Sequence, residues 1–167
     1  MDKPIVNRVA NSNLMVIDLE DFYPQGKRER IDISEWLFEG VVLKEKEFRK
    51  SVDLHDWSQY NGAYIALDCS TDAIIPGWAF MLISIQLAPY AKKISVGSIA
   101  ELESLLFSEI IEFLNLDPYE DKSVIIKGCS NKPIPQNAYV FLAKRLQPIA
   151  RKIMYGEACS AVPLFKK

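Results

Sequence analysis

A repeated pattern in the second half of the chain constrains the fold more than any other feature of the sequence. In both copies, Cys-Ser is followed by Ile-Pro, by a single Ala and then by Leu-x-Pro-x-Ala, two basic residues and Ile. Cys69 and Cys129 lie 60 positions apart, whereas the closing Gly97 and Gly156 lie 59 apart, so one single-residue gap aligns the copies. The pattern predicts two similar units, at residues 62–98 and 122–157.

Each copy indicates a strand, a helix and a second strand. Short apolar runs without alternation are typical of parallel strands that are buried on both faces. Proline is tolerated at the start of a helix, and a second proline near the end helps to terminate it. The expected strands are residues 63–67, 93–96, 123–126 and 152–155, and the expected helices are residues 76–88 and 135–147.

A third helix is expected between the copies, over residues 98–115. Ser98 and Glu101 form a capping box there, in which each side chain can bond the backbone amide of the other residue. The apolar side of this helix is expected to comprise Leu102, Leu105, Leu106, Ile110 and Phe113. Earlier in the chain, Leu14–Leu19 resembles a strand, and we expect residues 1–60 to form a small N-terminal lobe on a core of residues 61–167.

The alternation of strands and helices places the chain in the α/β class. We expect a mostly parallel sheet built from two duplicated β-α-β units, with helices on both faces, plus the N-terminal lobe. Counted from residue 62, the expected strand order in that single sheet is 2-1-3-4. The strands that lead to Cys69 and Cys129 would then be neighbours, and open α/β sheets bind ligands in the crevice at such a position.

The three cysteines carry the sharpest chemical pattern. Cys69, Cys129 and Cys159 each precede a serine and lie at or just past the carboxyl end of an expected strand. Adjacent strands are about 4.8 Å apart, so the three thiolates could hold zinc or, as a second choice, an iron–sulfur cluster. The fourth ligand would be His55, the only histidine, or Glu157. If the cysteines instead pack in the core like small apolar side chains, no cofactor is implied.

The segment that precedes the second expected helix also suggests an anion site. Lys127 and Ser130 flank Gly-Cys before the helix, where backbone amides can bind a charged cofactor group. The same residues also fit a tight turn from strand to helix. No pattern in the chain identifies a catalytic residue.

Composition narrows the location and the partners. The net charge of −2 and the pI of about 5.5 argue against a nucleic-acid partner. Ala73–Ala91 has no charged residue, but Pro76, Gly77 and Pro89 interrupt its apolar run, so we interpret it as a buried helix and not as a membrane span. Three cysteines and no apparent signal peptide favour the reducing cytoplasm.

Three segments are distinctive enough to suggest a relationship: Cys69–Ala79, Val124–Cys129 and Met154–Pro163. They resemble an uncharacterised bacterial family that is defined only as a domain of unknown function, and the resemblance covers nearly the whole chain. It implies a compact cytoplasmic protein and carries over no activity and no catalytic residue. It also associates the chain with iron–sulfur cluster assembly proteins as partners.

The leading hypothesis is therefore a cytoplasmic metal- or sulfur-handling protein with a three-cysteine site, linked to iron–sulfur metabolism. One alternative is a non-catalytic interaction or scaffold module, with inert buried cysteines and a homodimer as one form of it. Another is a metal-independent enzyme that acts on a small molecule in the crevice.

Overall fold

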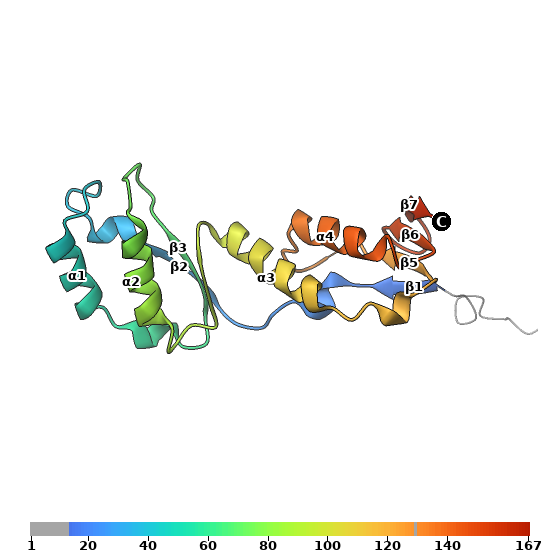
Figure 1. The fold of residues 1–167 in the computed structure, drawn as a ribbon, viewed down its shortest axis with the longest axis horizontal. Coiled ribbons are helices and arrows are strands. Elements are labelled where there is room, and N and C mark those ends of the chain that lie inside the picture. The colour runs from blue at the N-terminus through green and yellow to red at the C-terminus, as the bar shows by residue number, and fades with distance from the viewer. Residues whose placement is uncertain (1–13, 129) are drawn as a thin grey trace, which may run out of the picture. The chain divides into compact units, whose positions relative to one another are not determined.

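The computed structural model describes residues 14–128 and 130–167, and these form two compact units (Figure 1). Unit 1 comprises Met1–Tyr23 and Phe107–Lys167, and unit 2 comprises Pro24–Leu106. Each unit has its own sheet and its own apolar core. The boundary between them falls within helix α3 (Ile99–Phe113).

Unit 2 contains a parallel three-stranded sheet with the order β2-β3-β4. Its strands are β2 (Arg28–Asp32), β3 (Tyr64–Asp68) and β4 (Lys93–Val96). The helices are α1 (Glu45–Leu54), α2 (Gly77–Leu87) and the first part of α3, with 3-10 helices η2 (Ile33–Trp36) and η3 (Trp57–Tyr60).

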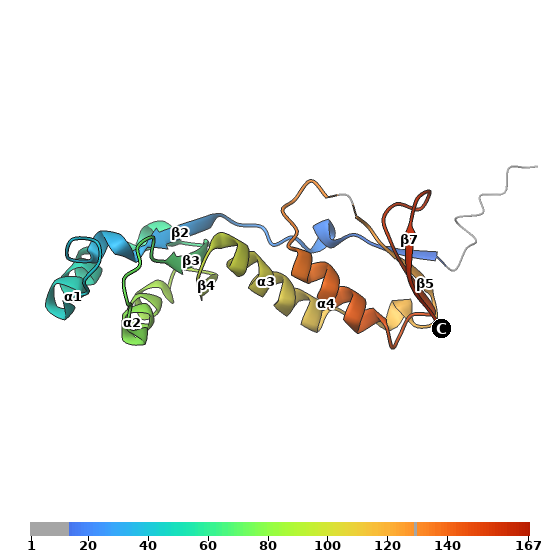
Figure 2. The same ribbon diagram turned by 90° about the horizontal axis from the view of Figure 1, so that it is seen from above.

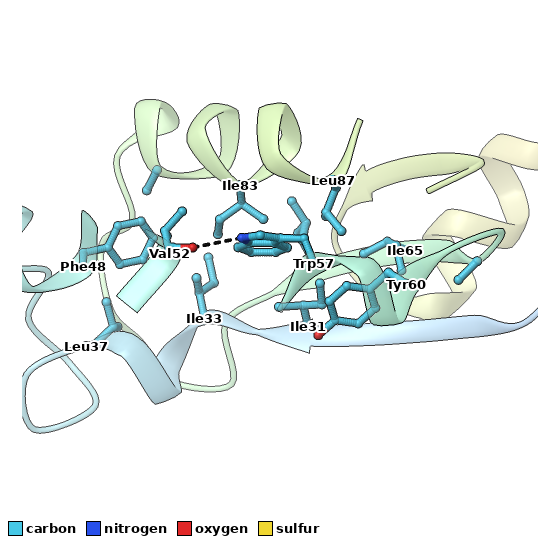
Figure 3. Close-up of a cluster of buried hydrophobic side chains, with 13 residues drawn as sticks. Ile31, Ile33, Leu37, Phe48, Val52, Trp57, Tyr60, Ile65, Ile83 and Leu87 are labelled. Atoms are coloured by element: carbon cyan, nitrogen blue, oxygen red, sulfur yellow. Dashed lines mark hydrogen bonds between the residues drawn. The ribbon is translucent and has the colours of Figure 1, made fainter. Parts of the chain in front are cut away.

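Side chains of β3 alternate between two cores, as the period of a strand requires. Ile65 and Leu67 contact the larger core, which includes residues of α1 and α2, whereas Ala66 packs with Leu102 and Leu106 of α3. The helices of unit 2 therefore cover both faces of its sheet. Figure 3 shows Trp57 within the larger core, where its indole N–H donates to the Val52 carbonyl at 2.9 Å.

Unit 1 contains a four-stranded sheet with the order β1-β5-β6-β7. Its strands are β1 (Leu14–Ile17), β5 (Ser123–Ile126), β6 (Lys152–Tyr155) and β7 (Val162–Lys166). The first three run parallel, whereas β7 pairs antiparallel with β6 through a register shift between Ile153 and Met154. Pro163 is accommodated because β7 is an edge strand.

Helix α4 (Gln136–Leu146) lies beside the second part of α3 in unit 1 (Figure 2). Buried residues of both helices share one core with Val124 and Ile126 of the sheet. Arg145 donates to the carbonyls of Ile111 and Leu114 near the end of α3, the latter at 3.0 Å. Two 3-10 helices, η1 (Leu19–Phe22) and η4 (Asp117–Tyr119), complete the unit.

The α/β class is confirmed, and several expected elements have the predicted bounds. Strands β4, β5 and β6 match residue for residue, and α2 and α4 each begin directly after a proline. The capping box also forms. The amide of Ser98 donates to Glu101 Oε2 at 2.7 Å, and the amide of Glu101 donates to Ser98 Oγ at 3.3 Å.

The prediction of one sheet with the order 2-1-3-4 is wrong. Strands β3 and β5 are not neighbours, because β3 pairs with β2 and β5 pairs with β1. The first sixty residues thus supply one strand to each sheet, and the boundary that we predicted at residue 60 falls inside unit 2. Each repeat copy does form a strand, a helix and a parallel strand, but their origin by duplication stays a prediction.

The expected apolar side of α3 is only partly right. Leu102 and Leu106 are buried, but Phe113 is 87% exposed. Phe107 and Ile111 are buried in its place, because the second part of α3 faces the core of unit 1 and the first part that of unit 2.

Candidate functional site

The two cysteines that the structure describes, Cys69 and Cys159, do not follow strands of the same sheet. Cys69 follows β3 of unit 2, Cys159 lies in the segment between β6 and β7 of unit 1, and Cys129 lies outside the described residues. The Sγ atom of Cys69 is 3.4 Å from Thr71 Oγ1, and Cys159 is exposed. The predicted crevice lies between β3 and β5 as neighbours in one sheet. It does not form, because these strands belong to different sheets.

The metal- or sulfur-handling hypothesis is therefore wrong. Within the part of the chain that the structure describes, no group of three or more His, Cys, Asp or Glu side chains could hold a metal ion. The hypotheses of zinc and of an iron–sulfur cluster lose their support with it. Of the two expected fourth ligands, His55 lies in unit 2 and Glu157 in unit 1, where Glu157 acts electrostatically on Lys127.

At the predicted anion site, acidic side chains of the chain itself already bind Lys127 and Ser130. Lys127 Nζ lies 2.5 Å from Asp18 Oδ2, and this hydrogen bond raises the pKa of the lysine. Ser130 Oγ donates to Glu20 Oε1 at 2.9 Å, and the amides of Asn131 and Lys132 donate to the same oxygen, the latter at 2.7 Å. An external anion would have to displace Glu20 from these donors.

The carboxyl end of the unit 2 sheet carries a network of charged side chains. Asp32 Oδ1 accepts from the amides of Ser34 at 3.1 Å and Ser70 at 3.0 Å, which joins the loop after β2 to the loop after β3. Arg30 Nη2 lies 2.9 Å from Asp68 Oδ2 and 3.5 Å from Asp32 Oδ2. Burial alone would raise the pKa of Asp32, but its hydrogen bonds with Ser70 and Ser34 outweigh burial and lower it far below its usual range.

A polar pocket of about 280 Å³ opens next to this network. Its walls include Glu35 and Trp36 of η2, Tyr60 of η3, and His55 between α1 and η3. His55 Nε2 lies 3.0 Å from Tyr60 Oη, and the two rings are nearly parallel, with centroids 5.7 Å apart. Burial lowers the pKa of His55, against the opposing effect of Asp56 and Glu35. The imidazole is therefore neutral at neutral pH.

The outward face of α2 presents a second feature, an apolar groove of about 620 Å³. Met81 and Ile85 line it and are 66% and 68% exposed, and Phe80 and Val96 extend it. Gly77 begins the helix, and Ser84 lies between Met81 and Ile85 along it. Exposed apolar surface of this kind is typical of interaction sites.

Nearly the whole chain matches a protein family. Residues 3–167 match the family described as "Protein of unknown function (DUF2480)". The chain belongs to this family. The resemblance seen in the sequence is thus confirmed. Comparison with curated proteins and with solved structures finds no match in either set.

Membership of the DUF2480 family assigns no activity, so partners and location depend on other observations. Among the described residues, no helix has both the length and the apolarity that crossing a membrane requires. A cytoplasmic location, the absence of a nucleic-acid partner and an association with iron–sulfur assembly proteins stay predictions.

Sequence reasoning missed most of the pocket in this DUF2480 chain. Only His55 was singled out, because it is the sole histidine. A usable signal was present in Asp-x-Ser, since Asp32 and Asp56 each cap a 3-10 helix by accepting from the amide of the serine two positions later. These caps place η2 and η3, and with them Glu35 and Tyr60, at the pocket.

Proposed function

We propose that the protein is a non-catalytic interaction module that self-associates through the outward face of α2. The observation that supports this most directly is the exposure of Met81 and Ile85 beside an apolar groove, on a helix without any charged residue. Full burial of such a side chain from water is worth about 1.5–3 kcal/mol, and covering these two, which are 66% and 68% exposed, would gain about two-thirds of that for each.

Comparison with helix α4 indicates that folding alone does not require the exposed apolar side chains of α2. Both helices bury three residues spaced four apart, Ala79, Ile83 and Leu87 in α2 and Ala138, Leu142 and Leu146 in α4. In the shared alignment, the position of exposed Ile85 is occupied in α4 by exposed Lys144. Exposed Val140 takes the position of Met81, so the two outward faces differ at the position of Ile85, where α4 packs on its sheet equally well with a lysine.

The proposed occupant of the groove is a second copy of this chain. In an antiparallel pair of α2 helices, each N-terminus lies beside the C-terminus of the partner helix. Asp72 lies five residues before α2 and Lys92 five residues after it, and Lys92 is exposed although its Nζ also donates to the Gln25 carbonyl, so opposite charges would lie near both ends of the pair. Gly77 and Ser84 would let the helices approach closely, next to the larger Met81. Such a contact is isologous and closes as a dimer.

The test is the oligomeric state of the full chain by sedimentation equilibrium. We expect a dimer at about 100 µM, well above the Kd of ordinary stable interfaces. The double variant Met81→Lys/Ile85→Lys should be monomeric, with an unchanged circular dichroism spectrum. The matched control is Val140→Lys on α4, where the wild-type side chain is 63% exposed, and it should stay dimeric. A monomeric wild-type protein, or equal loss of the dimer in the control, would contradict the proposal.

A further inference from the structure

The pocket beside His55 has a charge distribution that self-association through α2 does not explain. Arg30 is the one cationic side chain among its lining residues, and Asp68 and Asp32 already pair with it. Glu35 also lines the pocket, and its carboxylate makes no hydrogen bond or ion pair within the described residues. Arg30 is thus one positive charge beside the carboxylates of Asp32, Asp68 and Glu35, so the charged groups here are negative in sum.

The titration of Tyr60 is consistent with a negative local potential. Burial raises the pKa of its phenol, and the carboxylates of Glu29, Glu35 and Asp56 raise it further. His55 does not offset this negative charge at neutral pH, because burial keeps its pKa below the ordinary value. A cation would therefore find a favourable potential here, and an anion would not.

Aromatic rings supply the remaining contact surface. Trp36 and His55 meet edge to face with centroids 5.2 Å apart, and Tyr60 lies nearly parallel to His55. Rings beside a carboxylate are a common way to bind an organic cation, since the face of an aromatic ring attracts positive charge. His55 Nδ1 makes no hydrogen bond within the described residues and is available to a bound ligand.

We propose that this pocket binds a small primary ammonium compound, with Glu35 as its counter-ion and Trp36 as its aromatic wall. The volume of about 280 Å³ corresponds to roughly nine water molecules at about 30 Å³ each. The ligand class is therefore a short alkylamine or a similar organic cation, and a nucleotide is too large.

Three probes of similar size test this directly: butylammonium, butyrate and 1-butanol. Binding is followed through the amide and indole signals of Trp36 and the ring signals of His55 in NMR titrations of the full chain. We expect saturable binding of butylammonium with a Kd of about 1 mM, as suits so small a ligand. Butyrate and 1-butanol should not saturate at about 20 mM, roughly twentyfold above that Kd.

The variant Glu35→Gln keeps the shape of the side chain and removes its charge. It should weaken butylammonium binding about fivefold or more. The matched control is Glu47→Gln in α1, an exposed glutamate that does not line the pocket, and its Kd should equal that of the wild type. The Met81→Lys/Ile85→Lys variant should also bind as the wild type does, which separates this site from the groove on α2.

Three outcomes would overturn the proposal. The first is a failure of butylammonium to saturate any of the three sets of signals. The second is equal or tighter binding of butyrate, which would identify Arg30 as an anion site. The third is an equal loss of affinity in Glu35→Gln and Glu47→Gln, which would show that the affinity depends on the net charge of the protein and not on Glu35.

Discussion

Helices α2 and α4 perform the same packing task with different outward faces. Each has 11 residues, follows a proline, connects two parallel strands and buries an Ala, a branched apolar residue and a Leu. Toward solvent, α4 presents Lys144 where α2 presents Ile85. Both helices expose an apolar side chain at the other aligned position, Met81 in α2 and Val140 in α4. Packing on a sheet requires only one apolar stripe, so the additional exposed Ile85 of α2 needs a reason other than folding.

The loops that lead into these helices differ in a similar way. In unit 2, Asp32 at the end of β2 accepts from the amide of Ser70 after β3. In unit 1, Glu20 from η1 accepts from Ser130 and Lys132 after β5. Both loops are thus bonded to an acidic side chain at or just after the end of the adjacent strand, but unit 2 uses the shorter acid and one of its bonds is partly buried. The two units reach the same connection with different side chains.

The largest predicted effect on stability concerns the buried side chains of α2 and α4, which should contribute equally to the cores of their units. Ile83→Ala and Leu142→Ala each remove most of a fully buried side chain, so each should lower the free energy of unfolding by about 2–5 kcal/mol. Native-state hydrogen exchange should place the loss in unit 2 for Ile83→Ala and in unit 1 for Leu142→Ala. If either variant lowers protection equally in both units, the cores of the two units are not independent.

A smaller effect is expected from the acid that holds each loop. Asp32→Ala removes the cap of η2 and the bond to Ser70, which should cost about 1–2 kcal/mol in thermal or urea unfolding. Glu20→Ala should cost less, because water competes for the exposed hydrogen bonds of Glu20, whereas the bond from Ser34 to Asp32 is partly buried. An equal or greater loss in Glu20→Ala would show that the two loops depend on their acids in the opposite order.

The elements that were predicted well are those whose own residues determine them. Prolines fix the starts of α2 and α4, and three of the four residues of β5 are buried, on both faces of the strand. Strand β2 was missed because only Ile31 of its residues is deeply buried. Arg28 Nε lies 2.6 Å from Glu103 Oε1, and the two side chains are only 12% and 6% exposed. This ion pair allows a strand with charged residues to lie within the sheet.

The cysteine site failed because sheet order depends on pairings between distant segments. The repeat was assumed to pair with itself, yet each copy pairs with a strand from the first 32 residues. Nothing in the apolar run of β3 distinguishes β2 from β5 as its neighbour. The pocket was missed for a related reason, since Glu35, His55 and Tyr60 meet only after β2 is placed beside β3.

Mild acid should lower the stability of unit 2 more than that of unit 1, because the only histidine lies in unit 2. Burial lowers the pKa of His55 in the folded state, so the unfolded state takes up its proton first as the pH falls below about 6.5. The stability of unit 2 should therefore decrease from pH 7.5 to about pH 5.5, before the carboxylates titrate. Urea unfolding followed by hydrogen exchange measures this, with His55→Phe as the control that should remove the decrease. A decrease of the same size in unit 1 would assign the effect to other groups.

The smallest effect on stability is expected where the helices differ most. Ile85→Lys gives α2 the residue that α4 carries at the aligned position, and Ile85 is 68% exposed. Because the wild-type side chain is mostly in water already, the free energy of unfolding of the monomer should change by no more than about 0.5 kcal/mol. Dimerisation should weaken in the same variant, since a lysine would face the partner helix across an apolar contact. Lys144→Ile on α4 is the reciprocal change, and it should leave the dimer as it is. A loss of several kcal/mol in Ile85→Lys would mean that this face packs within the monomer, and α2 would then not be a docking helix.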